Sequence, residues 1–98
     1  MNKKDRFEQI THQISEHTSV KVRDIFSSKK IKPMADARHL LLYILHKEGF
    51  THSYISMFLE DNGTSRHHTS ITHGITKASA MIKKRKDMQE IVDEICAA

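Results

Sequence analysis

The chain has few of the residues that break or cross-link a fold. Of its 98 residues, one is proline, three are glycine, one is cysteine and none is tryptophan. The single cysteine, Cys96, excludes an internal disulfide and is typical of a reducing, cytoplasmic setting. The β-branched residues form no alternating runs, so no sheet is predicted. The length fits one small domain over residues 1–98, and these absences favour an all-α fold.

Long apolar stretches and nucleotide-binding motifs are also missing. The longest strongly apolar run, Leu40 to Leu45, is far shorter than the roughly 20 residues that cross a bilayer. Residues 1–10 lack the apolar core of a signal peptide. No phosphate loop of the form Gly-x-x-x-x-Gly-Lys-Ser/Thr occurs. We therefore expect no membrane association, no bound nucleotide and no ATPase activity.

Acidic residues are absent from the middle of the chain. The sequence carries 16 Lys and Arg against 12 Asp and Glu, a formal net charge of +4. Residues 62–86 contain six Lys or Arg and no acid, whereas residues 87–98 contain four acids and no Lys or Arg. A face with charge of one sign is typical of a protein that binds a polyanion. The sequence therefore predicts a nucleic-acid surface.

Helical periodicity accounts for most of the chain. We expect helices over residues 4–17, over one or two turns near 20–26, over 33–48, from 51 or 53 to about 60, over 65–82 and over about 86–96. Pro33 suits the first turn of the central helix and Gly49 its C-terminal end, while Thr51 or Ser53 can cap the next helix. The result is a monomer of five or six helices around one long apolar helix. The last helix could instead form a dimer seam, but so small a chain needs its buried area.

Two consecutive helices follow the central one. Ile71, Ile75, Ala78 and Ile82 lie on one side of the second, and its other side is polar and cationic. Asp61 to Thr64 form the turn before it. A helix, a short turn and a cationic helix are the helix-turn-helix pattern, here over about residues 53–81. Such a unit places its second helix in the major groove of DNA.

Two segments carry a family resemblance: SVKVRDIFSSKKIKPMADARHLLLYIL (residues 19–45) and SYISMFLEDNGTSRHHTSITHGITK (residues 53–77). The first has a valine-rich turn, a basic loop and a long helix that opens with Ala35-x-x-Arg38. The second contains Arg66-His67-His68-Thr69-Ser70-Ile71-Thr72-His73, where seven of eight positions match or conserve the signature Arg-Asp-His-Thr-Thr-Val-x-His. Over about residues 8–82, the chain resembles the C-terminal DNA-binding domain of the bacterial replication initiator DnaA, a Trp-repressor-like helical fold.

The resemblance implies sequence-specific binding to double-stranded DNA, in replication initiation or its regulation, and a nucleoid-associated place in the cytoplasm. In the family, the signature opens a recognition helix that reads the major groove, and the basic loop enters the adjacent minor groove. Together with the cations after residue 82, the expected DNA contacts are Lys29, Lys30, Lys32, Ser53, Arg66, His67, His68, Thr69, Ser70, His73, Lys77, Lys83, Lys84 and Arg85. The family tends to have arginines in the basic loop, so the lysines here predict a weaker minor-groove contact.

Other activities have less support in the residues. The eight histidines lack the i, i+4 spacing of a helical zinc pair and Cys96 has no cysteine partner, so we expect no metal site. No local motif indicates nucleophilic catalysis, and no carboxylate cluster indicates a nuclease, so we expect no enzyme and no cofactor. The remaining alternatives are a transcription regulator of a phage or mobile element, an RNA-binding module and a protein-interaction adaptor that uses the acidic last helix.

His67 stands where the family signature has aspartate. Aspartate only accepts hydrogen bonds, for example from cytosine N4, whereas histidine also donates and titrates near about pH 6.5. We expect His67 to make this protein read a different base. Site selection from random duplexes should give different sites for the wild type and His67→Asp, and identical sites would contradict this role. We also expect DNA affinity to rise from about pH 8 to 6, because exposed histidines gain charge.

Overall fold

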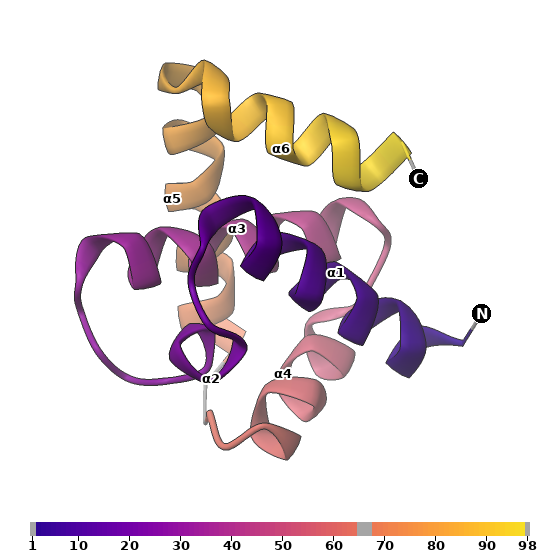
Figure 1. Ribbon diagram of the computed structural model, residues 1–98. Coiled ribbons are helices and arrows are strands. Elements are labelled where there is room, and N and C mark those ends of the chain that lie inside the picture. The colour runs from indigo at the N-terminus through magenta and orange to yellow at the C-terminus, as the bar shows by residue number, and fades with distance from the viewer. Residues whose placement is uncertain (1, 65–67, 98) are drawn as a thin grey trace.

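Six helices and no strand make up the part of the chain that the computed structural model describes (Figure 1). It covers residues 2–64 and 68–97, without the side chains of residues 68 and 69. The helices are α1 (Lys3–Thr18), α2 (Val22–Ile25), α3 (Lys32–Lys47), α4 (His52–Asp61), α5 (His68–Lys84) and α6 (Lys86–Ala97). The predicted all-α class is confirmed. Among the described residues, no helix combines the length and apolar character needed to cross a membrane.

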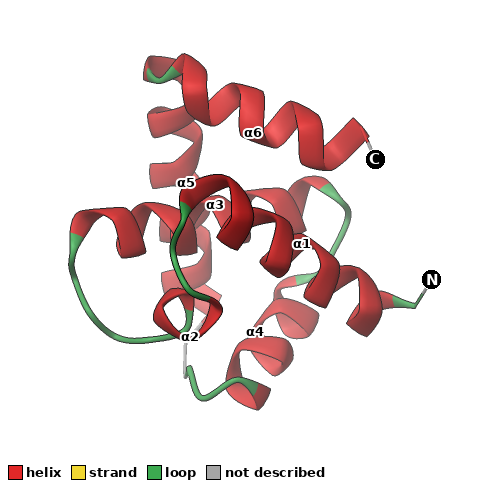
Figure 2. Cartoon of the chain, in the orientation of Figure 1, coloured by secondary structure: helices red, strands yellow, loops and turns green. Residues whose placement is uncertain are grey.

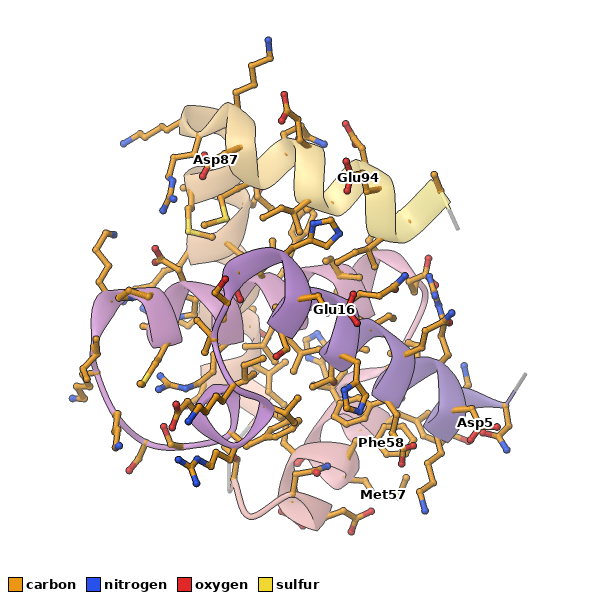
Figure 3. The ribbon with its side chains drawn as sticks, viewed as in Figure 1. Asp5, Glu16, Met57, Phe58, Asp87 and Glu94 are labelled. Atoms are coloured by element: carbon orange, nitrogen blue, oxygen red, sulfur yellow. The ribbon has the colours of Figure 1, made fainter. Side chains whose placement is uncertain are left out.

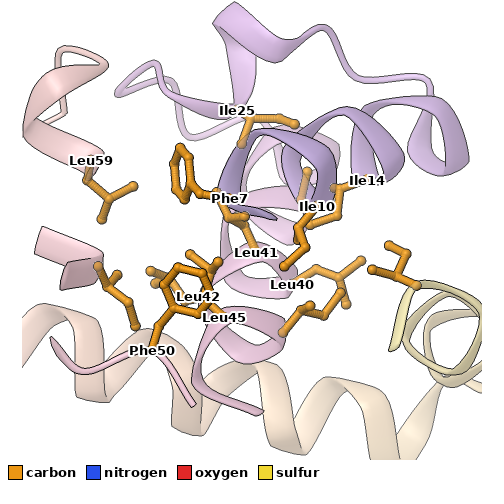
Figure 4. Close-up of a cluster of buried hydrophobic side chains, with 14 of the residues drawn as sticks. Phe7, Ile10, Ile14, Ile25, Leu40, Leu41, Leu42, Leu45, Phe50 and Leu59 are labelled. Carbon is orange, nitrogen blue, oxygen red and sulfur yellow. The ribbon is translucent and has the colours of Figure 1, made fainter. Parts of the chain in front are cut away.

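α3 lies at the centre, and every other helix packs against it (Figure 1). Its side chains Leu40, Leu41, Leu42, Ile44 and Leu45 are all at most 1% exposed. Side chains from α1, α2 and α4 converge on them in a single core (Figure 4). Complete burial of one such side chain stabilises the fold by about 1.5–3 kcal/mol. The expectation that the broad apolar face of this helix makes it the centre is confirmed.

Glycines follow the ends of α3 and α4. Gly49 has a φ of 91°, and its N–H and that of the next residue donate to the carbonyls of His46 and Leu45, both at 3.0 Å. Gly63, with a φ of 85°, ends α4 with the same pair of bonds. Glycine adopts this left-handed backbone without the steric cost of a Cβ. Pro33 lies in the first turn of α3, as predicted.

α5 crosses α3 at close range. Gly74 is buried on the inner side of α5, together with Ile71, Ala78 and Ile82. A Cβ built on Gly74 would lie 2.5 Å from Cδ1 of Leu42. The missing side chain therefore allows the two helices to approach. Glycine inside a helix costs about 1 kcal/mol relative to alanine, and the close packing offsets that cost.

α6 folds back onto the domain. Its buried residues Met88, Val92 and Ile95 contact the core, and the helix packs against α1, α3 and α5. Intramolecular packing, rather than a dimer seam, is therefore the role of its apolar side. The face that remains exposed carries its acids, among them Asp87 and Glu94, which are labelled in Figure 3.

Gly74→Val should lower the free energy of unfolding by about 1–3 kcal/mol, because the added branches overpack the crossing. Leu42 is 1% exposed and has little room to move away. Urea unfolding measures the change. Ala80→Val, at an exposed position of the same helix, is the control for the low helix propensity of valine and should cost only about 0.5 kcal/mol. Equal stability of the two variants would show that the contact between α3 and α5 can accommodate a larger side chain at position 74.

Candidate nucleic-acid interface

Exposed polar and cationic side chains form a stripe along the outer side of α5. The stripe consists of Ser70, His73, Lys77 and Lys84, all exposed. Their spacing places them along one flank of the helix, beside its buried side. At 1.5 Å per residue, the stripe is about 21 Å long. None of the residues of α5 is acidic, so a partner along this side meets only cations and hydrogen-bonding groups.

The basic loop, residues 26–31 between α2 and α3, lies beside the first turns of α5. Figure 2 shows this loop standing out at the edge of the molecule. Ser28 and Lys30 of the loop, Gly63 of the turn after α4 and Ser70 of α5 line one open depression of about 590 Å³. The fold therefore brings the loop and the stripe onto one continuous surface, although they are far apart in the sequence.

Two hydrogen bonds tie this surface together. The guanidinium of Arg38, which is only 8% exposed, donates from α3 to the carbonyl of Lys29. The hydroxyl of Thr64, just before α5, donates to the carbonyl of Phe26 at the start of the loop. A charged donor gives the stronger class of hydrogen bond. The loop is thus held both to the central helix and to the turn that leads into α5.

The beginning of α4 also reaches α5. Thr51 is the cap of α4, because its Oγ1 accepts from the N–H of Tyr54 at 3.2 Å. Ser53 is exposed in the first turn, so its hydroxyl is available to a partner. His52 Nδ1 lies 3.5 Å from Thr72 Oγ1, which places this end of α4 against α5. A phosphate bound beside Ser53 would lie at the start of a helix, where the backbone N–H groups and the helix dipole favour an anion.

Arg85 belongs to the junction of α5 and α6 rather than to the stripe. Its Nη1 lies 2.9 Å from Oδ2 of Asp36, and its Nη2 lies 3.0 Å from Oδ2 of Asp87. The hydrogen bond with Asp87 outweighs desolvation and raises the pKa of Arg85, and the same bond lowers the pKa of Asp87. A guanidinium held by two carboxylates is poorly placed to bind phosphate. The contact of Arg85 with DNA stays a prediction, and these two ion pairs weaken its support.

The lysines of the surface are more available. Lys32 starts α3 instead of ending the loop, and its Nζ lies 3.7 Å from Oδ1 of Asp36 while its side chain is 80% exposed. An exposed pair of this kind is worth roughly 0–1 kcal/mol, so a phosphate can displace it. Within the described residues, Lys29, Lys30, Lys77, Lys83 and Lys84 are all exposed and form no ion pair.

Not every predicted contact falls within the described residues. Arg66 and His67 lie outside them, and so do the side chains of His68 and Thr69, whose backbones open α5. Sequence reasoning missed Thr64 and named Arg38 only as a match to the family pattern. A charged residue beside Ala37, on the buried side of an apolar helix, needs an internal partner, and that was the available signal for Arg38.

Other kinds of site have weak support in the described part of the chain. It contains no group of three or more His, Cys, Asp or Glu that could hold a metal ion. Burial raises the pKa of the Cys96 thiol, which disfavours the reactive thiolate. All four phenylalanines are buried, and Tyr54, 41% exposed, lies beneath the ammonium of Lys3 at 5.3 Å. A stacking platform for single-stranded bases is therefore not built from these residues.

Comparison with known proteins adds no family. The chain matches no protein-family model, and no solved structure matches it. Its function is therefore inferred from this surface and from the sequence resemblance.

Replacing each candidate cap of α4 separates a structural from a binding role. Thr51→Ala should lower the free energy of unfolding by about 1 kcal/mol, because it removes the acceptor for the N–H of Tyr54. Ser53→Ala should change it by less than about 0.5 kcal/mol, since its exposed side chain is not the cap. Chemical denaturation of both variants makes the comparison. A larger loss for Ser53→Ala would refute the assignment of Thr51.

Proposed function

We propose that this domain binds double-stranded DNA in a sequence-specific manner, with α5 in the major groove and the basic loop at the adjacent minor groove. The observation that carries the proposal is the continuous acid-free surface from the stripe of α5, across the open depression, to Lys30 of the loop. An α-helix fits the major groove of B-DNA, and lysines that flank it neutralise phosphates. The proposed reading unit is α4 with α5, a helix-turn-helix.

The parts of this surface have different roles in the proposal. Ser70 and His73 offer hydroxyl and imidazole groups that can hydrogen-bond to base edges, and they specify sequence. Lys77 and Lys84 lie further along the stripe, where a long cation reaches the phosphate backbone. Ser53 supports the same backbone from the start of α4. Base contacts of the segment before residue 70 complete the proposed set.

The resemblance to the DNA-binding domain of DnaA supports a role in the initiation of DNA replication or in its regulation, at the nucleoid in the cytoplasm. No ATPase motif occurs in this sequence, so the proposed activity is DNA recognition without ATP hydrolysis. The same surface would also serve a transcription regulator of a phage or mobile element. The sequences selected from a random pool, compared with genomic replication origins and promoters, distinguish these two roles.

The two alternative functions, RNA binding and protein binding, require surface features different from those of a DNA-binding domain. RNA recognition uses exposed aromatic rings, and the described aromatic residues are mostly buried. An adaptor that docks through α6 would have to use its acidic face, because Met88, Val92 and Ile95 are already buried in the domain. It would bind a basic protein with no shift of duplex DNA.

Binding to duplex DNA should weaken steeply with salt. Neutralising about five phosphates gives a slope of log affinity against log salt of roughly −4 to −5. Lys77→Ala should weaken binding to all duplexes alike and make the slope shallower by about 1, whereas Ser70→Ala should change the preference among sequences. Fluorescence anisotropy on a selected site and on an unrelated duplex measures both effects.

Lys4→Ala is the matched control, since Lys4 is an exposed lysine of α1, outside the proposed surface. It should leave the affinity and the salt slope nearly unchanged. Affinity that does not respond to salt, or equal effects of Lys4→Ala and Lys77→Ala, would argue against the proposed surface.

A further inference from the structure

Ile31 is the most exposed large apolar side chain among the described residues, at 55%. It lies between the exposed residues Lys30 and Lys32, at the position that precedes α3. A single exposed apolar residue is common on protein surfaces and by itself needs no explanation. The setting of Ile31 is what distinguishes it, because its neighbours are cations and its backbone is held from both sides.

The backbone around Ile31 is fixed. On its C-terminal side, its own carbonyl accepts the N–H of Ala35 at 3.0 Å, the first bond of α3. On its N-terminal side, Arg38 holds the carbonyl of Lys29. Ile31 therefore follows directly on Lys30, which lines one depression with Ser70. A partner that binds α5 meets Ile31 without first ordering the loop.

The chemistry of the surroundings selects the partner. An isoleucine side chain makes no hydrogen bond to phosphate or water, and it gains free energy only by leaving water for apolar surface. In duplex DNA, the apolar surfaces are the thymine methyl groups in the major groove, the sugar rings along the minor groove and the stacked faces of the bases. Proteins that bind the minor groove insert apolar wedges, isoleucine among them, between base steps and bend the duplex. Lysines on both sides of the wedge suit the phosphates that line the groove.

We propose that Ile31 is a wedge that enters the minor groove next to α5, presses on a base step and bends the DNA. This inference rests on the proposed DNA-binding function. A wedge would favour particular DNA sequences without any hydrogen bond to a base. Pyrimidine–purine steps such as TA and CA/TG unstack most easily, so sites that contain them would bind more tightly. The bound sites should therefore hold such a step beneath the loop, beside the base pairs that α5 reads.

The other exposed apolar residues lack this setting. Tyr54 and Met57 are 41% and 45% exposed, but they lie on α4, with Glu60 and Asp61 exposed at the end of the same helix. Figure 3 shows Met57 at the opposite edge of the molecule from α6. Met57 therefore provides a matched control, namely an apolar side chain of similar exposure in a less cationic setting.

The test compares the wild type, Ile31→Ala, Ile31→Leu and Met57→Ala on a duplex selected by the wild type. Energy transfer between dyes at the two ends of the duplex reports the bend, and anisotropy reports affinity. Ile31→Ala should reduce the bend and lower affinity about tenfold, since it removes most of the buried apolar group. Ile31→Leu should retain both properties, and Met57→Ala should match the wild type.

A second duplex, in which a stiff A-tract replaces the flexible step, makes the test specific. The replacement should weaken the wild type and leave Ile31→Ala nearly unaffected, because only a wedge needs the step to unstack. If Ile31→Ala bends both duplexes as the wild type does and binds them equally well, Ile31 does not act as a wedge, although the domain still binds DNA. If the wild type and Met57→Ala bind no duplex at all, the proposed function fails, and the wedge with it.

Discussion

Every other helix of the described chain packs against α3, so the burial of this one helix is the constraint on which the structure depends. Six of its aliphatic side chains are at most 1% exposed, which is possible only if neighbours cover it from several directions. A short chain with a single large apolar helix has few ways to meet that demand. The positions of α1, α5 and α6 follow from covering α3.

The same helix fixes the two halves of the candidate interface relative to each other. α5 is set against it at Gly74, where a side chain would collide with Leu42, and the basic loop is tied to it by Arg38. Because both contacts are made to one helix, α3 limits how far the loop and the stripe can move apart. Surfaces organised before binding lose less conformational entropy when a partner arrives.

Local patterns predicted the helices well, since apolar spacing, Pro33 and Gly49 are read within a few residues. They left Thr51 and Ser53 as alternative caps of α4, and the hydrogen bond to the N–H of Tyr54 identifies Thr51. The lysines of the loop are exposed, as their place between a helix end and Pro33 predicted. Local sequence patterns could not predict contacts between residues that are distant in the sequence. The pairing of Arg85 with Asp36 and the bond from Thr64 to Phe26 join parts of the chain that only the packing of α3 brings together. The sequence therefore did not show that Arg85 is held by two carboxylates.

The break between α5 and α6 at Arg85 affects how the molecule would move in an electric field. Had the helix continued straight, the four carboxylates of residues 87–94 would lie in line with the lysines of α5. Instead, α6 turns across the domain and carries them away from the axis of α5 (Figure 1). The lysines of α5 and the acids of α6 therefore lie on helices that run in different directions, and charge is unevenly distributed over the molecule. Near a strongly negative polymer, the resulting torque would turn α5 and the loop toward it before contact, which raises the fraction of encounters that begin in the right orientation.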